Sequence, residues 1–480
     1  MNTLFDIISV LDRKEMTRFK DFALSPYFNK HLEVQDILVY LNGIYPQFTE
    51  KNCSNEALWA AVFLEEKAAL KKIPVLLTYV RRLLYQFLDV EAYGQSQTSD
   101  AVFLLTQLRR KKKVKEHLKH MDKERKSISN QQLRDSYFFY KQFLLDREAD
   151  QMYTQQSVVA EKGALQQKAN HLDAYYLSEK LKDACEMLVR GRMEKVEYSS
   201  VLLEAILEVI RKDSEQYFKI PPVYVYYHIY QMITGEETKY YEAAFDAVGK
   251  VAHYFPKEEL QNIYNYLQNY CVYQINKGRR EFLLASFELY QVQLEEGLLF
   301  VGDLLPEEHY KNMVTAGLRL QKLDWVYNFL EKYRTSLFAK VQENAYSYNL
   351  AEYYYATGEY KKAMRLLLQV NYTDPRYSMG SKALLLRTYY DLEEHEALMA
   401  LCKSFAQLLR RDKSISEFRR KGYKNLFNFT KKLSQIRYQY PFTKKEKSAG
   451  ALAGLKEQLK EATPVFNERW LESRLLAFDG

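Results

Sequence analysis

Few residues of this chain have types and spacings suited to catalysis. His117 and His120 lie three positions apart, so one helical turn would bring both imidazoles to one face, where they could bind a metal ion. The lysines around them would repel a cation. We therefore expect both histidines to lie on a solvated helix face.

The usual cofactor and active-site motifs are missing from the sequence. Gly249-Lys250 is followed by Val251, so the Ser or Thr that holds magnesium in a phosphate-binding loop is lacking. The sequence contains neither a GxSxG nor an HExxH motif. None of its eight histidines follows a glutamate by three positions, as in di-iron bundles. We expect no catalytic residue, metal or cofactor, although an active site assembled from distant residues stays open.

Tyrosine and arginine side chains, which are favoured at protein interfaces, recur at helical spacing in two stretches, residues 348–355 and 387–390. They fall opposite the apolar face of their predicted helices, where a stack of helical hairpins would present a concave surface to a peptide. The alternative is that they are ordinary surface or packing residues. The candidate partner-binding residues are Tyr348, Glu352, Tyr355, Arg387 and Tyr390.

Basic residues gather in two stretches of a chain whose formal net charge is +8. Residues 410–447 contain 13 Lys or Arg against 3 Asp or Glu, and residues 109–126 contain 10 against 3. The rest of the chain is therefore acidic. Such stretches can bind nucleic acid, but they are more often solvated helix surfaces.

The second stretch contains a predicted amphipathic helix over residues 422–440, with Phe427 and Tyr438 near the edge of its basic side. Lysines there could hold phosphates while the aromatic rings stack on bases. The alternative is a solvated outer face, which we also expect for the helix–helix corner at residues 109–113. The candidate nucleic-acid-binding residues are Arg420, Lys421, Lys424, Lys431 and Lys432.

Composition indicates that helices position these residues. The chain has 480 residues, of which 47% are hydrophobic, with only 16 Gly and 10 Pro. Long stretches without either residue favour helices over a turn-rich β fold. The four cysteines are widely separated, which indicates a reducing cytosol, and no stretch is apolar enough to span a membrane.

Residues 346–375 contain a large–small pair, an aromatic residue, a turn glycine, a second small residue and a closing proline. These are Leu350, Ala351, Tyr354, Gly358, Ala363 and Pro375. The stretch resembles a tetratricopeptide repeat, a pair of helices that stacks on its neighbours. Weaker copies lie about 35 positions downstream and about 37 upstream, near the usual period of roughly 34, and a fainter one surrounds Gly278.

Helix-capping and helix-breaking residues mark the boundaries of the other predicted parts of the chain. Asp12 and Glu15 have the spacing of a capping box, Ser54 could cap a helix, and Pro221-Pro222 marks a boundary. We expect an all-α helical-hairpin solenoid. Its predicted parts are a compact helical unit (1–94), helical hairpins (95–220), a repeat region (221–411), a basic helix (412–443), a linker (444–454) and a capping helix (455–480).

Asp12-Arg13-Lys14-Glu15, Leu172-Asp173-Ala174-Tyr175-Tyr176 and Asn269-Tyr270-Cys271 resemble an uncharacterised family of long helical proteins from Bacteroidota-type bacteria. That resemblance implies a bacterial, cytoplasmic protein without implying an activity. We therefore expect a non-catalytic scaffold that binds protein partners through the Tyr-rich face. A nucleic-acid-associated protein that uses residues 410–447 and 109–126 is the alternative.

Overall fold

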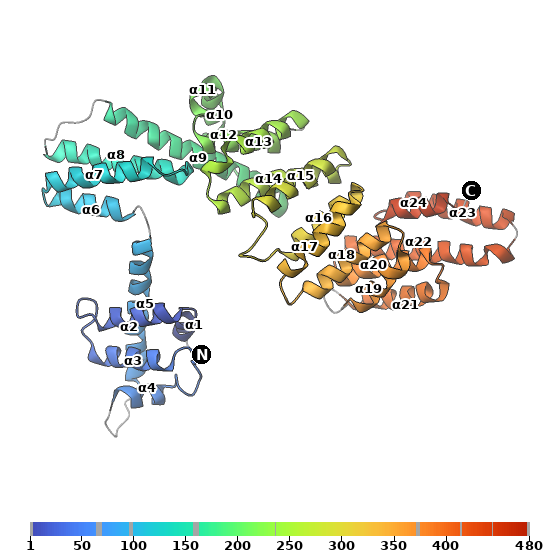
Figure 1. Ribbon diagram of the computed structural model, residues 1–480, viewed down its shortest axis with the longest axis horizontal. Helices are drawn as coiled ribbons and strands as arrows, with labels where there is room; N and C mark the ends of the chain where they lie inside the picture. The colour runs from blue at the N-terminus through green and yellow to red at the C-terminus, as the bar shows by residue number, and fades with distance from the viewer. Residues whose placement is uncertain are drawn as a thin grey trace. The chain divides into compact units, whose positions relative to one another are not determined.

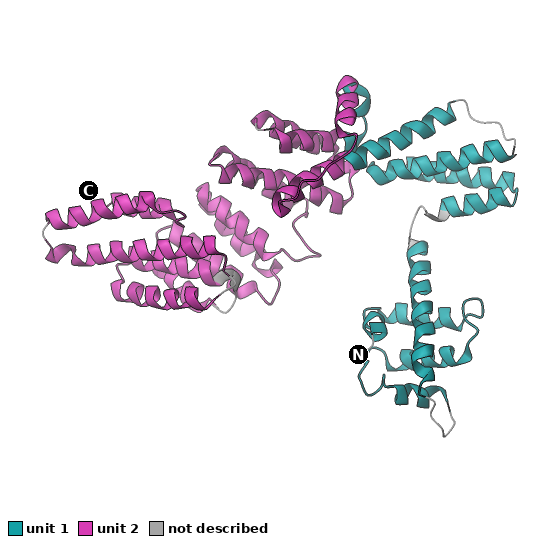
Figure 2. Cartoon of the chain, turned by 180° about the vertical axis from the view of Figure 1, so that it is seen from behind, with its two compact units in different colours: residues 1–180, 214–223 teal, residues 181–213, 224–480 magenta. Residues whose placement is uncertain are grey.

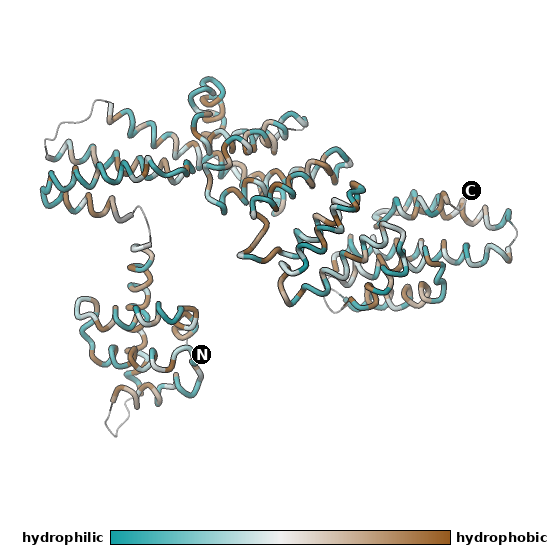
Figure 3. The backbone as a smooth tube through the Cα atoms, in the orientation of Figure 1, coloured by the Kyte–Doolittle hydropathy of each residue, from teal (hydrophilic) through white to brown (hydrophobic). Residues whose placement is uncertain are grey.

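The computed structural model describes residues 3–63, 70–95, 99–156, 163–235, 237–370, 375–412, 415–443 and 445–477. Over these residues the chain forms 24 α-helices and three short 3₁₀-helices, with isolated β-bridges but no β-strand (Figure 1). Successive helices pair as hairpins, and hydrophobic and hydrophilic residues alternate along each of them (Figure 3). The predicted all-α hairpin fold is confirmed.

The chain forms two compact units, shown in teal and magenta in Figure 2. Unit 1 comprises residues 1–180 and 214–223, and unit 2 comprises residues 181–213 and 224–480. The chain passes between the units inside the long helix α9 (Ala164–Glu194), again at residues 213–214 and again at residues 223–224, three residues from the predicted boundary. Pro221, where the sequence predicts a boundary, is the first residue of a helix, a position that suits proline because the first turn needs no amide donor.

Unit 1 begins with five helices around one apolar core, which includes Phe19, Leu38 and Leu84. Their start and stop signals act as the sequence predicts. Asp12 accepts a hydrogen bond from the Glu15 amide at 2.7 Å while Glu15 accepts one from the Asp12 amide at 2.7 Å. The helices are α1 (Thr3–Ser9), α2 (Arg13–Leu24), α3 (Leu32–Ile44), α4 (Asn55–Val62), which Ser54 caps, and α5 (Lys72–Gln95).

The remainder of unit 1 is a helical hairpin with a third helix packed against both arms. Lys112, with φ of 57°, makes the corner between the arms in the left-handed region. Phe138 and Leu145 lie in a small core with Leu105 and Met121. The helices are α6 (Ser99–Arg110), α7 (Val114–Ser129) and α8 (Ser136–Gln156), with the first part of α9 and the short α11 (Ser214–Tyr217).

Unit 2 continues with hairpins whose cores are rich in tyrosine and phenylalanine, such as Tyr226, Tyr310 and Phe287. Most of these tyrosines bury their rings, as expected of a residue that joins a large apolar surface to one polar atom. The helices are α10 (Leu203–Lys212), α12 (Pro221–Thr234), α13 (Thr238–Val251), α14 (Lys257–Asn276), α15 (Glu281–Glu295), α16 (Glu307–Arg319) and α17 (Leu323–Tyr333), with 3₁₀-helices η1 (Ala252–Tyr254) and η2 (Arg334–Ser336).

The predicted central hairpin is present in unit 2. Gly358 turns the chain with φ of 80°, which only glycine adopts without strain, and Ala351 and Ala363 are fully buried between the arms. The last helices are α18 (Gln342–Ala356), α19 (Tyr360–Gln369), α20 (Pro375–Asp391), α21 (His395–Arg411), α22 (Glu417–Gln439), α23 (Lys445–Glu461) and α24 (Glu468–Leu476), with η3 (Tyr440–Phe442).

The predicted linker over residues 444–454 is wrong for its described part, because residues 445–454 belong to α23. Two glycines in that stretch favour a linker by local propensity. Leu452, Leu455 and Leu459, however, are buried against the neighbouring helices, and their burial outweighs the cost of the glycines. α24 follows after Pro464 and buries Leu471 and Leu475 in the same core.

Candidate interaction surfaces

The structure places the five residues of the predicted Tyr-rich face on α18 and α20, and one chain of contacts joins Tyr348, Glu352, Arg387 and Tyr355. The Tyr348 hydroxyl donates to Glu352 Oε1 at 3.0 Å, and Glu352 lies 3.5 Å from the Arg387 guanidinium. That guanidinium lies 4.7 Å from the centre of the Tyr355 ring, which it covers. These polar groups therefore find their partners within the face itself.

Two more helices of the chain complete the contacts of this face. The Tyr355 hydroxyl donates to Asp391 at 2.5 Å, and the same carboxylate accepts two hydrogen bonds from Arg474 of α24 at 2.6 and 3.1 Å. Tyr390 packs edge-on against Trp470 of α24 at 5.5 Å and lies under Arg437 of α22. The side chain of Asp391 is only 6% exposed.

Burial distinguishes the tyrosines of this face from an open binding surface. Tyr348 and Tyr390 are 5% and 3% exposed, and burial raises the pKa of the Tyr348 hydroxyl well above its ordinary value. A buried phenol of this kind stays protonated and donates to its carboxylate. The sequence identified the residues that meet here, but in the structure they pack against the chain's own helices.

The first basic stretch contains a buried ion pair rather than a wholly solvated corner. Arg109 is 7% exposed, and its Nε donates to Glu148 Oε1 at 2.6 Å. Arg109 also reaches Gln151 at 2.7 Å and Gln155 at 2.5 Å, while the rest of the corner at residues 110–113 is exposed. The prediction of a solvent-exposed corner is therefore wrong for Arg109, because α8 brings a carboxylate to it.

The prediction that His117 lies on a solvated helix face is also wrong. It is fully buried, with Nε2 3.6 Å from Glu148 Oε1, instead of lying on a solvated face. Its Nδ1 has no hydrogen-bond partner among the described residues. His120 is only partly buried, and the described part of the chain contains no group of three or more His, Cys, Asp or Glu side chains that could hold a metal ion.

The five predicted nucleic-acid-binding residues divide between two sides of α22. Arg420, Lys424 and Lys431 lie on the side that faces α21, whereas Lys421 and Lys432 lie about 100° further round the helix. Lys432 donates to Gln458 of α23 at 2.7 Å. The predicted basic side of the helix therefore consists of two rows, and the first row lines a groove.

We refer to the groove between α21 and α22 as the basic groove; its volume is about 710 Å³. Phe405 and Phe427 close its base, with their rings stacked at 3.7 Å and 10°. Ala400 and Ala406 on α21 are exposed and leave room above this base. Among the described residues that line the groove there is no Asp or Glu, and its cations are Lys403, Arg410, Arg420, Lys424 and Lys431.

These cations differ in what they contact. Arg420 donates to the main-chain oxygens of Leu409 and Asp412, the second at 2.8 Å, so it caps the end of α21. Lys403, Lys424 and Lys431 have no hydrogen-bond or ion-pair partner within the described ranges, apart from water. Three ammonium groups thus remain available to an anionic ligand.

The groove offers no nucleophile and no open aromatic face. Burial raises the pKa of the Cys402 thiol to about 12, so the thiol stays protonated at neutral pH. Phe427, expected near the edge of the basic side, is only 4% exposed. Tyr438 is exposed but stacks on His395 at 4.3 Å, away from the residues that line the groove.

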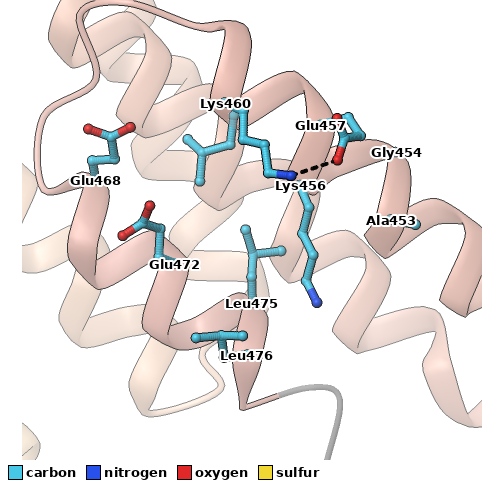
Figure 4. Close-up of a pocket in the computed structure, with 10 residues that line it drawn as sticks. Ala453, Gly454, Lys456, Glu457, Lys460, Glu468, Glu472, Leu475 and Leu476 are labelled. Atoms are coloured by element: carbon cyan, nitrogen blue, oxygen red, sulfur yellow. Dashed lines mark hydrogen bonds and ion pairs between the residues drawn. The ribbon is translucent and has the colours of Figure 1, made fainter.

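Another groove, of about 870 Å³, lies between α23 and α24 (Figure 4). Lys456 and Lys460 project from α23, and Glu468 and Glu472 from α24, around Leu475. Lys460 is paired with Glu457 at 2.9 Å. With both signs of charge on its rim, this groove does not select the charge of a ligand as the basic groove does.

No protein-family model and no curated protein matches this sequence. Within the described ranges, none of the helices combines the length and the apolar composition that crossing a bilayer requires. We therefore infer a function from the geometry of the surfaces described above.

Proposed function

We propose that this chain is a non-catalytic helical scaffold that binds an acidic, amphipathic segment of a partner protein in the basic groove. The observation that carries this proposal is the set of three unpartnered lysines, Lys403, Lys424 and Lys431, above an apolar base. Like charges on one groove repel each other, and a matching anion relieves that repulsion.

The exposed alanines of the basic groove favour a peptide over a nucleic acid. A helix lying between α21 and α22 would place its apolar face against Ala400 and Ala406 and its carboxylates toward the lysines. Single-stranded nucleic acid needs exposed rings on which bases stack, and both phenylalanines of this groove are buried. Because α21 has 17 residues and is roughly 25 Å long, it can support about five turns of a partner helix.

The Tyr-rich face supports the proposal less well, because its charges already have partners. Arg387 is ion-paired with Glu352, and Asp391 accepts hydrogen bonds from Tyr355 and Arg474, so a charged peptide group would have to compete with these contacts. The lysines of the basic groove need lose only water.

The test is a binding titration by fluorescence anisotropy with the full chain. The probe is a labelled amphipathic peptide of about 18 residues, with leucines on one face and glutamates on the other. We expect saturable binding that weakens at least about tenfold in the variant Lys424→Glu/Lys431→Glu, because both new carboxylates repel the probe. A peptide with lysines in place of the glutamates should not bind.

The matched control is Lys421→Glu/Lys432→Glu, which makes the same change in net charge on the other side of α22. Equal loss of affinity in both variants would mean that only overall charge matters, and the groove would be excluded. Single-stranded oligo(dT) is tested in parallel. Binding of oligo(dT) but not of the peptide would overturn the proposal in favour of a nucleic-acid partner.

A further inference from the structure

A second groove in unit 2 has a different chemistry; we refer to it as the amide groove. It lies between α9 and α14, has a volume of about 570 Å³, and has Tyr226 of α12 in its lining. From α14 it is lined by Asn262, Asn265 and Asn269, which are three and four positions apart and therefore project from one face of the helix. Three asparagines in line make a row of amide groups.

These amides are without a partner in the part of the chain that the structure describes. All three asparagines are exposed, and none makes a side-chain hydrogen bond among the described residues. Each amide carries an acceptor oxygen and two N–H donors. One row therefore presents both kinds of hydrogen-bonding group to a ligand.

The charged groups of the amide groove, in contrast, are largely paired. Lys182 donates to Glu259 at 3.1 Å, and the buried Tyr226 hydroxyl donates to the same carboxylate at 2.9 Å. The Tyr266 hydroxyl donates to Glu186 at 2.7 Å, and Arg190 forms an ion pair with that carboxylate. The groove therefore has a polar, fixed lining with little need of a charged ligand.

We propose that the amide groove binds an extended polypeptide segment through its main chain. A peptide main chain offers one N–H and one C=O at each residue, and an asparagine amide can pair with both at once. Asn265 and Asn269 lie about 6 Å apart along α14, close to the roughly 6.6 Å at which an extended chain repeats its same-side groups. Val189 and Met193 of α9 supply apolar contact across the groove.

This inference is independent of the basic groove, because the two sites differ in their lining. A main-chain ligand is selected by its conformation and by its N–H and C=O groups more than by the charge of its side chains. Binding to the amide groove should consequently change little with salt, whereas binding to three unpaired lysines should weaken as salt screens them.

The test is selection of linear peptides from a displayed library of random dodecamers on the full chain, with counter-selection on the triple variant Asn262→Ala/Asn265→Ala/Asn269→Ala. We expect the selection to yield peptides that bind the wild type. Their affinity for the triple variant should be at least about tenfold lower, because several hydrogen bonds are lost. N-methylation of alternate peptide residues should abolish binding of a selected peptide, because it removes main-chain donors.

The control variant is Asn328→Ala, which removes an exposed asparagine of α17 outside the groove, and far-UV circular dichroism checks that both variants stay helical. Three results would overturn the inference. They are failure to enrich any peptide over the triple variant, equal binding by the triple variant, and indifference of the bound peptide to N-methylation.

Discussion

The two basic stretches of this chain have similar compositions but different contacts. In residues 109–126, Arg109 is buried and joined to Glu148, with His117 beside the same carboxylate. In residues 410–447, Lys424 and Lys431 line a groove whose described lining residues include no carboxylate. A cation with a buried partner is part of the fold, and a cation without one is available to a ligand.

The difference depends on residues that are distant in the sequence. Glu148 lies 39 positions from Arg109 and reaches it only because α6 and α8 pack side by side. Among the described residues that line the basic groove, no acid lies beside Lys424 in the same way. A basic stretch therefore indicates a binding site only after the acids that the fold places near it are known.

The largest effect is expected at the carboxylate of the first stretch. Glu148→Ala should destabilise unit 1 by about 3 kcal/mol, because it leaves the buried guanidinium of Arg109 without a countercharge. Urea unfolding followed by far-UV circular dichroism measures the loss, and hydrogen exchange locates it in α6–α8. Asp122→Ala, which breaks the exposed pair with Lys126, is the control and should cost less than about 0.5 kcal/mol. Equal losses would remove the distinction between a buried and an exposed ion pair.

A smaller effect is expected within the second stretch, where one cation is structural. Arg420→Ala should cost roughly 1–2 kcal/mol, because the carbonyl oxygens at the end of α21 lose their charged donor. Lys424→Ala, one helical turn away, should change stability by less than about 0.5 kcal/mol. Urea midpoints of the two variants give the comparison. A Lys424 variant as unstable as the Arg420 variant would show that its ammonium is not free.

The smallest effect is the dependence of the first stretch on pH. Burial raises the pKa of Glu148, but the His117 ring 3.6 Å away and the hydrogen bonds from Arg109 and Thr106 outweigh it, and the pKa lies below the ordinary value of 4.5. The unfolded chain therefore takes up this proton first as the pH falls. The stability that Glu148 contributes is present above pH 4.5 and is lost as the pH falls from 4.5 through the folded pKa.

Urea unfolding between pH 7 and pH 3 measures this dependence. The difference in stability between the wild type and Glu148→Gln should shrink as the pH falls, because the variant cannot titrate at this position. A difference that is constant across the range would mean that the charge of Glu148 does not contribute to folding.

Local signals in the sequence predicted the helices well. The capping box at Asp12 and Glu15, the cap at Ser54 and the turn at Gly358 depend on residues within three or four positions of each other, and all are present. The meeting of Tyr348 with Glu352 follows from the same helical spacing. Sequence spacing alone could therefore predict the central hairpin and which residues share one face of a helix.

The sequence could not show what covers a face. Tyr390 meets Trp470, and Tyr355 shares Asp391 with Arg474, through packing between helices that are far apart in the chain. His117 is buried for the same reason, although lysines flank it. The row of asparagines in the amide groove was visible as Asn262, Asn265 and Asn269 at helical spacing, but α9 had to be placed beside it before it formed a groove.

The contact between Asp391 and Arg474 also has a consequence for synthesis. The two residues are 83 positions apart, so a ribosome finishes α18 and α20 well before it makes α24. Until then Asp391 lacks Arg474 and the Tyr390 ring lacks Trp470, although α18 and α20 can already form. The growing chain therefore passes through an interval in which this part of its Tyr-rich face is uncovered, and the synthesis of α24 ends that interval.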